Sequence, residues 1–281
     1  MSMKQAEPLV REITVGQWGM ISTRQASAVG VSRLDLSRLE KAGKLERMST
    51  GIYRQTAAPQ SQYDNVRAAW LSTEPETLAW KRYDEPSVIV GSSTAAWLHR
   101  IGDLQPEPYE FFSTTRRQSA RDDVHFRQRT IASNELRIVE GLPATSVEQT
   151  IADLLQDVGD VSLVGAAFRD AATSGREPDR GRMEPMLAGL AKRYGFAPGN
   201  GGQVYDMLAV EAGTDPESVF VRYANQVDLQ PYIDESVRKF MDEAVRKALA
   251  ENKEWSEMLQ RLGADVPRAL SSGKVSRPDA G

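Results

Sequence analysis

Arginine, lysine and hydroxyl side chains recur between residues 24 and 54 of this sequence. Cationic side chains of this kind pair with phosphates, and an arginine in the major groove can read the edge of a guanine. A solvated surface or a protein-docking module is the alternative interpretation. We expect the following residues to contact DNA: Arg24, Ser32, Arg33, Ser37, Arg38, Lys41, Lys44, Arg47, Thr50 and Arg54.

A second basic cluster surrounds His125 and is diluted by Asp122 and Asp123. Such a cluster can follow DNA phosphates beside a first contact, or it can be the solvated side of a hairpin. The possible secondary DNA contacts are Arg116, Arg117, Arg121, Arg127 and Arg129.

Few residues of this sequence are suited to catalysis. The chain has no cysteine and two histidines, so thiolate catalysis and cysteine-ligated metal sites are excluded. His99 lies in an apolar helical segment and His125 in a basic strand, without a second histidine at ligand spacing. The glycine-rich residues 199–202 follow no strand and lack the P-loop lysine, so they predict a flexible turn. We expect no catalytic residue, no metal, no cofactor and no enzymatic activity.

Charge is distributed unevenly along the 281 residues. The formal net charge is −4, which argues against a protein that coats nucleic acid indiscriminately. Residues 1–55 nevertheless hold nine basic and five acidic residues, so this segment is +4 and the remainder is −8. A protein that binds selected DNA sites can have such a small basic head on an acidic body, and a +4 segment is also common on solvated surfaces.

Apolar runs are short. None exceeds the six residues 163–168, against about 20 for a membrane-spanning helix, and the first residues lack a signal-peptide core. We therefore expect a cytoplasmic protein without a membrane partner.

The basic head has the element order of a winged helix-turn-helix. Apolar spacing predicts a first helix over residues 9–15, and Trp18, Met20 and Ile21 form a short apolar entry. Ser22 or Thr23 can cap a second helix over 23–29, Gly30 supplies the turn, and Ser32 can cap a third helix that ends at Ala42. Residues 44–48 and 52–54 then alternate as a hairpin around the turn 49–51.

The third helix has one apolar and one polar face. Leu36, Leu39 and the stem of Glu40 share the inner face. Helical spacing turns the opposite face outward, with Arg33 at its flank; that face carries Leu34, Ser37, Arg38 and Lys41. In a winged helix this outward face enters the major groove, and the hairpin tip reaches the neighbouring backbone.

The rest of the chain predicts an α+β fold, with a mixed α/β body and a helical C-terminal region. Residues 55–62 are expected to form a linker or the exit of a strand. Helices are expected over 63–72, after Ser92 or Ser93, after Ser146, and over 161–172 and 183–194, and strands over 87–90, 109–114, 124–127 and 136–139. Apolar stripes at 233–248 and 255–262 predict core or partner-binding helices. The expected domains are 1–58, 63–195 and 200–262, followed by a disordered tail over 263–281.

Several segments, in order, resemble the AbiEi-type antitoxins of bacterial type IV toxin–antitoxin and abortive-infection systems. In the head they are residues 17–26 (QWGMISTRQA), 30–33 (GVSR), 36–39 (LSRL) and 51–54 (GIYR), and in the body 67–71 (RAAWL), 93–99 (STAAWLH), 141–146 (GLPATS) and 153–155 (DLL). The resemblance spans roughly residues 10–195. It implies a winged helix that represses the protein's own operon at an inverted-repeat operator, and a larger part that counteracts a nucleotidyltransferase-type toxin, directly or functionally.

Two alternatives stay open. A stand-alone winged-helix repressor would carry a dimerising or ligand-sensing body. Winged heads also precede nuclease domains of the very-short-patch-repair type, which need paired carboxylates and a Glu-x-Lys on neighbouring strands. Residues 251–253 have the letters Glu-Asn-Lys but lie in a strongly helical, charged segment.

Overall fold

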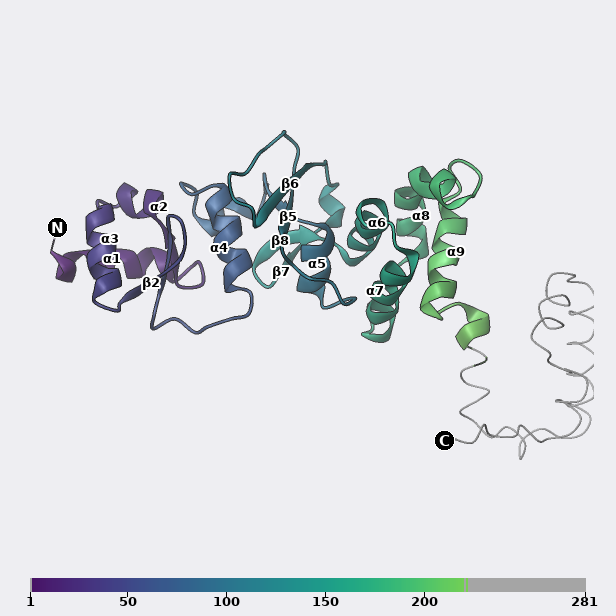
Figure 1. Ribbon diagram of the computed structural model, residues 1–281, viewed down its shortest axis with the longest axis horizontal. Coiled ribbons are helices and arrows are strands. Elements are labelled where there is room, and N and C mark those ends of the chain that lie inside the picture. Colours follow the sequence, from purple (N-terminus) through teal and green to yellow (C-terminus); the bar gives the residue numbers. More distant parts are fainter. Residues whose placement is uncertain (1, 220, 222–281) are drawn as a thin grey trace, which may run out of the picture. The chain divides into compact units, whose positions relative to one another are not determined.

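The computed structural model describes residues 2–219 and 221 (Figure 1). The chain divides into two compact units, Met1–Ser218 and Val219–Gly281, and almost all described residues belong to the first. The helical stripes predicted over 233–262 and the tail predicted over 263–281 lie outside the described residues. Within the described part, helices and sheets are combined as an α+β fold, which confirms the predicted fold class.

The N-terminal elements form a winged helix-turn-helix. Its helices and strands are α1 (Met3–Thr14), β1 (Met20–Ser22), α2 (Thr23–Ala28), α3 (Arg33–Lys41), β2 (Leu45–Ser49) and β3 (Ile52–Gln55). The three strands pair antiparallel in the order β1-β3-β2, and α1, α2 and α3 close a core around Val10, Ile21, Leu36 and Leu39. The apolar entry predicted at residues 18–21 is thus partly a strand, β1, paired with β3.

Serine caps set the start of both helices of the helix-turn-helix. Ser22 accepts a hydrogen bond from the amide of Gln25, and Ser32 accepts one from the amide of Asp35. In each case the third residue bonds back to the cap, so two otherwise unpaired amides are satisfied together. Gly30 has φ +80° in the turn between the helices, a conformation that glycine adopts without steric cost.

The winged helix is not a separately packed domain. Its Met20 and Ile52 lie in the same apolar core as Trp70 and Leu71 of α4 (Asp64–Thr73), the first helix of the body. Trp70 is fully buried, and its indole N–H donates to the carbonyl of Val88 at 3.0 Å. The linker predicted over 55–62 therefore connects two parts that share one core.

A five-stranded mixed sheet forms the centre of the body. The strand order is β6-β5-β4-β8-β7; β4–β8 and β5–β6 are parallel, and β4–β5 and β7–β8 antiparallel. The strands are β4 (Ile89–Val90), β5 (Tyr109–Ser113), β6 (Val124–Gln128), β7 (Leu136–Val139) and β8 (Leu142–Thr145). Strand β8 was not predicted, because Pro143 disfavours a strand assignment. It pairs with β7 across the turn at Glu140 and Gly141, where both residues have positive φ.

Helices cover the sheet and extend the unit beyond it. Helix α5 (Ser92–His99) contacts β5 and α6, and the later helices pack together around Leu154, Phe168, Leu187 and Leu208. The short 3-10 turns are η1 (Ala79–Arg82), η2 (Ser133–Glu135) and η3 (Ala188–Tyr194), and the later helices are α6 (Val147–Asp157), α7 (Val161–Thr173), α8 (Arg180–Leu187) and α9 (Gly201–Ala212). Figure 1 shows α6 to α9 side by side.

Two predicted boundaries, one of a helix and one of a domain, differ from those in the structure. The single helix predicted over 183–194 is α8 followed by η3. Helix α9 packs on α7 and α8, so the domain boundary predicted between 195 and 200 falls inside one compact unit. The glycine-rich break in the sequence is a turn within this helical layer.

Candidate nucleic-acid interface

The outward face of α3 is polar, cationic and exposed, as its spacing predicts. Leu36 and Leu39 are buried, whereas Leu34 is 59% exposed and the Arg38 side chain is 53% exposed. Arg33 and Lys41 are exposed, and Ser37 is half-buried. The predicted orientation of α3, with Leu36 and Leu39 inward, is therefore confirmed.

Ser32 has a structural role at the start of α3. Its hydroxyl donates to the carboxylate of Asp35 at 2.5 Å, and its amide donates to the same oxygen at 3.1 Å. The hydrogen bond from the Ser32 hydroxyl, followed by that from its backbone, lowers the pKa of Asp35. The carboxylate stays ionised, and it also pairs with Arg38 at 3.4 Å, which holds that side chain on the helix surface.

A groove of about 330 Å³ brings together four of the predicted DNA-contacting residues. Its walls come from the start of α2, the start of α3, the wing turn between β2 and β3, and the end of α4. The predicted residues that line it are Arg24, Arg33, Arg47 and Thr50. Ser72 and Pro75 also line it. The sequence does not predict them as site residues, because only tertiary packing brings the end of α4 to the wing.

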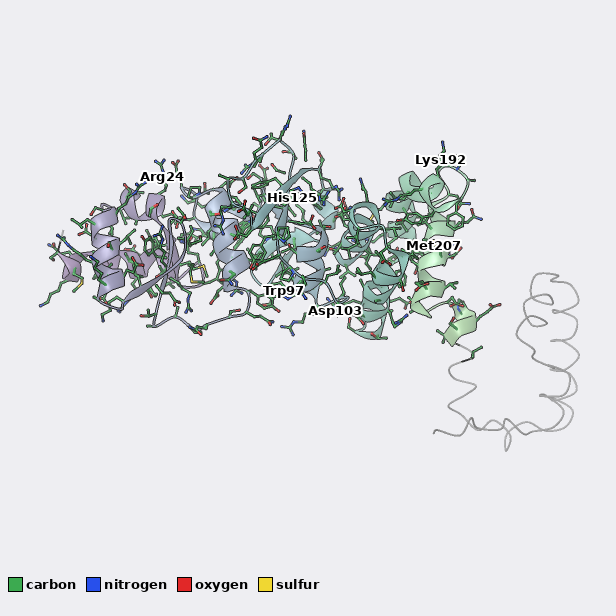
Figure 2. All side chains as sticks on the ribbon, viewed as in Figure 1. Arg24, Trp97, Asp103, His125, Lys192 and Met207 are labelled. Atoms are coloured by element: carbon green, nitrogen blue, oxygen red, sulfur yellow. The ribbon has the colours of Figure 1, made fainter. Side chains whose placement is uncertain are left out.

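The cations of the groove have weak partners. Arg24 lies 3.8 Å from Glu76, and both side chains are mostly exposed. Figure 2 labels Arg24 on α2. Arg47 donates only a long hydrogen bond, 3.4 Å, to the carbonyl of Ser49. Lys44, outside the groove, lies 3.7 Å from Glu7 and is 55% exposed. Exposed pairs of this kind contribute little free energy, so phosphate groups can replace the carboxylates.

Arg54 does not belong to this surface, and the prediction that it contacts DNA is wrong. Its side chain is 2% exposed and lies between Glu46 of β2 and Asp64 of α4, with 3.4 Å from Nη1 to Asp64 Oδ2. Nη1 also donates to the carbonyls of Ala58 and Pro59 at 3.1 and 3.2 Å. Arg54 therefore joins the wing to the body, and its position in β3 turns it away from solvent.

The end of the second basic cluster is internal to the body. Arg129 pairs with Asp153 at 2.7 Å and with Asp157 at 2.9 Å, and Arg127 pairs with Glu110 at 2.8 Å. These carboxylates are buried, and desolvation raises the pKa of Asp153 to about 7. Arg127 and Arg129 stabilise the contact between β6 and α6, so assigning them to DNA is wrong.

The arginines in the loop before β6 differ in their partners. Arg117 pairs with Glu74 at 2.9 Å, and Arg121 pairs with Asp123 at 2.5 Å. Both are bound to neighbouring segments rather than presented to solvent, which corrects their prediction as phosphate contacts. Arg116 is exposed and has no ion pair with any described residue, so its role stays a prediction.

The two histidines lie in different surroundings. His99 is 7% exposed, its Nε2 lies 2.7 Å from the carbonyl of Thr145, and burial lowers its pKa. His125 lies on β6 opposite Glu110, with 3.7 Å between Nδ1 and Oε1. Across residues 2–219 and 221, no three His, Asp or Glu side chains are arranged to hold a metal ion.

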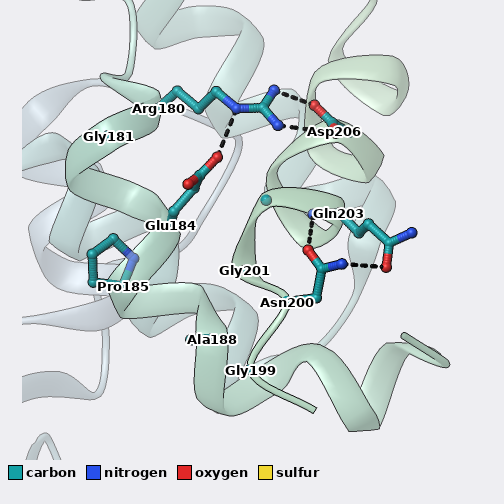
Figure 3. Close-up of a pocket in the computed structure, with 11 residues that line it drawn as sticks. Arg180, Gly181, Glu184, Pro185, Ala188, Gly199, Asn200, Gly201, Gln203 and Asp206 are labelled. Atoms are coloured by element: carbon teal, nitrogen blue, oxygen red, sulfur yellow. Dashed lines mark hydrogen bonds and ion pairs between the residues drawn. The ribbon is translucent and has the colours of Figure 1, made fainter. Parts of the chain in front are cut away.

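The glycine-rich residues 199–202 begin α9 (Figure 3). The side chain of Asn200 accepts a hydrogen bond from the amide of Gln203 and so caps the helix. A Cβ on Gly201 would lie 1.9 Å from the carbonyl oxygen of Glu184, so α8 and α9 approach closely only because this residue is glycine. Above the turn, Arg180 is shared between Glu184 and Asp206.

A match to one family model supports the winged helix. Residues 9–55 match the family model described as "Transcriptional regulator, AbiEi antitoxin". No curated protein matches the sequence. The crystal structure of the RV2827C protein from Mycobacterium tuberculosis aligns with a TM-score of 0.46 at 13% identity, over 77% of this chain and 78% of that one.

Among the described helices, none is long and apolar enough to span a membrane. The family match covers α2, α3 and the wing, and these elements carry the arginines that line the groove. The N-terminal segment of this chain is thus a winged helix that is similar, over residues 9–55, to the AbiEi antitoxin transcriptional regulators.

Proposed function

We propose that this protein is an antitoxin that represses its own operon by binding an inverted repeat in double-stranded operator DNA. The observation that carries the proposal is the groove in which Arg24, Arg33 and Arg47 meet beside the exposed face of α3. In this arrangement α3 enters the major groove with Arg38 and Lys41 toward the bases. The wing then presents Arg47 and Thr50 to the adjacent phosphates.

Operator binding is tested with a duplex that covers the protein's own promoter. In gel shifts at two salt concentrations, the Arg33→Ala/Arg38→Ala variant should bind much more weakly than the wild type. Lys192→Ala is the matched control, because Lys192 is an exposed cation labelled far from Arg24 in Figure 2. Unchanged affinity in the double variant would exclude α3 as the reading helix.

We further propose that the body counteracts a nucleotidyltransferase-type toxin, directly or functionally, as the family resemblance implies. Because Met20 and Ile52 share a core with Trp70, cutting the chain near residue 60 would expose that core in both fragments. Point variants of the full chain avoid this problem. The Arg24→Ala/Arg33→Ala/Arg47→Ala variant, expressed from an unrelated promoter, should lose operator binding and still rescue growth of cells that express the toxin.

A stand-alone repressor is the first alternative, and the same experiment separates it. If protection requires DNA binding, the triple variant will fail to rescue even though it is folded and abundant. Rescue by the triple variant would show that the body has an activity that does not depend on DNA binding.

We propose that the protein acts in the bacterial cytoplasm without catalysis, cofactor or metal. The nuclease alternative depends on residues 251–253, which lie outside the described residues. Incubation of the purified protein with DNA and RNA in the presence of Mg²⁺ or Mn²⁺ should leave both intact. Cleavage that is abolished by Glu251→Gln would establish the nuclease instead.

A further inference from the structure

A body arginine holds the wing in place. Arg121, in the loop between β5 and β6, donates from Nη1 to the hydroxyl of Ser49 at 3.0 Å and to that of Ser72 at 3.4 Å. Ser49 ends β2, where the pairing with β3 shifts register. The other side of the same guanidinium is fixed by Asp123, with 2.8 Å from Nε to Oδ1 and 2.5 Å from Nη2 to Oδ2. Arg121 therefore bridges the wing, α4 and its own loop.

The helix-turn-helix is attached to the body at a different place. Gln25 of α2 donates to the carbonyl of Thr77 at 2.8 Å, and the Ser22 hydroxyl donates to the carbonyl of Pro75. Gln17 connects these groups, because its side chain donates to Gln25 at 2.7 Å and accepts from the amide of Ala79 at 3.2 Å. The segment between α4 and η1 thus holds α2 independently of Arg121.

The two attachments together set the width of the cationic groove. One wall carries Arg24 and Arg33 and is held through α2; the other carries Arg47 and Thr50 and follows the wing. Ser72 and Pro75 of the body lie between the walls. The distance between the cations therefore depends on the body as well as on the winged helix itself.

We propose that Arg121 is a positioning residue of the DNA-binding site. It fixes the wing, and with it Arg47 and Thr50, at the spacing that the DNA backbone requires, and it does so without contacting DNA. All of its nitrogen atoms already donate to protein oxygens, and its side chain is 27% exposed. This proposal rests on the proposed operator binding and makes operator affinity depend on the conformation of the body.

The test compares two arginines of one loop in the full chain. Arg117 is also 27% exposed and also pairs with a carboxylate, Glu74, but it does not contact the wing. Operator affinity is measured by fluorescence anisotropy over a range of salt concentrations. Arg121→Ala should weaken binding about three- to tenfold, the effect of losing one hydrogen bond. Arg117→Ala should stay within about twofold of the wild type.

The salt dependence separates positioning from contact. Loss of a phosphate contact reduces the slope of log affinity against log salt by about 0.9, whereas Arg121→Ala should leave the slope unchanged. Ser49→Ala should reproduce the loss of affinity, and the double variant should lose no more than either single one. Ser49→Ala also serves as the readout if Arg121→Ala fails to fold.

The outcomes that overturn the proposal are distinct. A reduced slope in Arg121→Ala would make the residue a DNA contact. Unchanged affinity in Ser49→Ala, or an equal loss in Arg117→Ala, would show that the tether does not position the wing. A wild-type protein that fails to bind the promoter duplex would instead contradict the proposed function, and with it this proposal.

Discussion

The chain has two arginine-rich regions, and they differ in what faces them. In the winged helix, Arg24 and Arg47 are exposed; Arg24 has an ion pair at 3.8 Å and Arg47 a hydrogen bond at 3.4 Å. In the body, Arg127 and Arg129 face buried carboxylates at 2.7 to 3.5 Å. The same residue type thus stays available at the surface where it lacks close partners, and it stabilises packing where carboxylates pair with it. Carboxylates supplied from distant parts of the chain decide between the two.

The largest effect on stability is expected from removing Arg129 of the second basic cluster. Arg129→Ala leaves Asp153 buried without its cation and leaves Asp157 with Arg127 alone, at 3.5 Å. Loss of one partner of a buried pair costs about 3–5 kcal/mol. The measurement is the free energy of unfolding in urea. Arg116→Ala removes an exposed cation from the same cluster and should change stability by less than about 0.5 kcal/mol. A loss below about 1 kcal/mol in Arg129→Ala would contradict the internal role of this cluster.

The wing hairpin also contains one buried arginine, Arg54, and one exposed arginine, Arg47. Arg54→Ala removes a buried ion pair and should cost about 3 kcal/mol of unfolding free energy. Arg47→Ala should leave stability within about 0.5 kcal/mol and weaken operator binding instead. Equal stability of the two variants would show that Arg54 does not join the wing to the body.

Arg38 tests whether the exposed face of α3 reads sequence. Its guanidinium lies on the outward face, and loss of a base contact costs about 1–3 kcal/mol and relaxes specificity at one position. Competition between the operator and duplexes changed at single base pairs measures this effect for Arg38→Ala. A uniform loss over all duplexes would assign Arg38 to the phosphate backbone.

The buried carboxyl group of Asp153 also predicts that stability depends on pH. Desolvation raises the pKa of Asp153 to about 7, above its ordinary value of 3.8, so the folded protein binds an extra proton between these values. Stability should fall as the pH rises through this window, with a contribution of up to about 1.4 kcal/mol per pH unit. Asp153→Asn should remove that contribution. An identical pH profile of unfolding in the wild type and the variant would contradict the assignment.

Local signals made the winged helix predictable. Ser22, Gly30 and Ser32 act within a few residues of themselves, and the spacing of Leu36 and Leu39 fixes the inner face of α3. Strands β1 and β8 were harder to predict. Strand β1 has three residues and β8 contains Pro143, so each depends on pairing with a neighbouring strand more than on its own pattern.

The candidate site was predictable only in part, for a physical reason. The sequence shows where cations lie, but Arg129 finds its partners 24 and 28 residues away, and Arg121 reaches Ser49 across 72 residues. Burial of Arg54 likewise depends on Asp64 in the next helix. Spacing can therefore indicate a basic surface, whereas the fold determines which of its arginines remain available.

The salt dependence of operator binding tests the central claim most directly. Each phosphate contact contributes about 0.9 to the slope of log affinity against log salt. The account predicts that Arg24→Ala/Arg33→Ala/Arg47→Ala lowers this slope by about 2 to 3 and leaves the unfolding free energy close to that of the wild type. An unchanged slope and affinity in this folded variant would contradict the assignment of the groove to DNA.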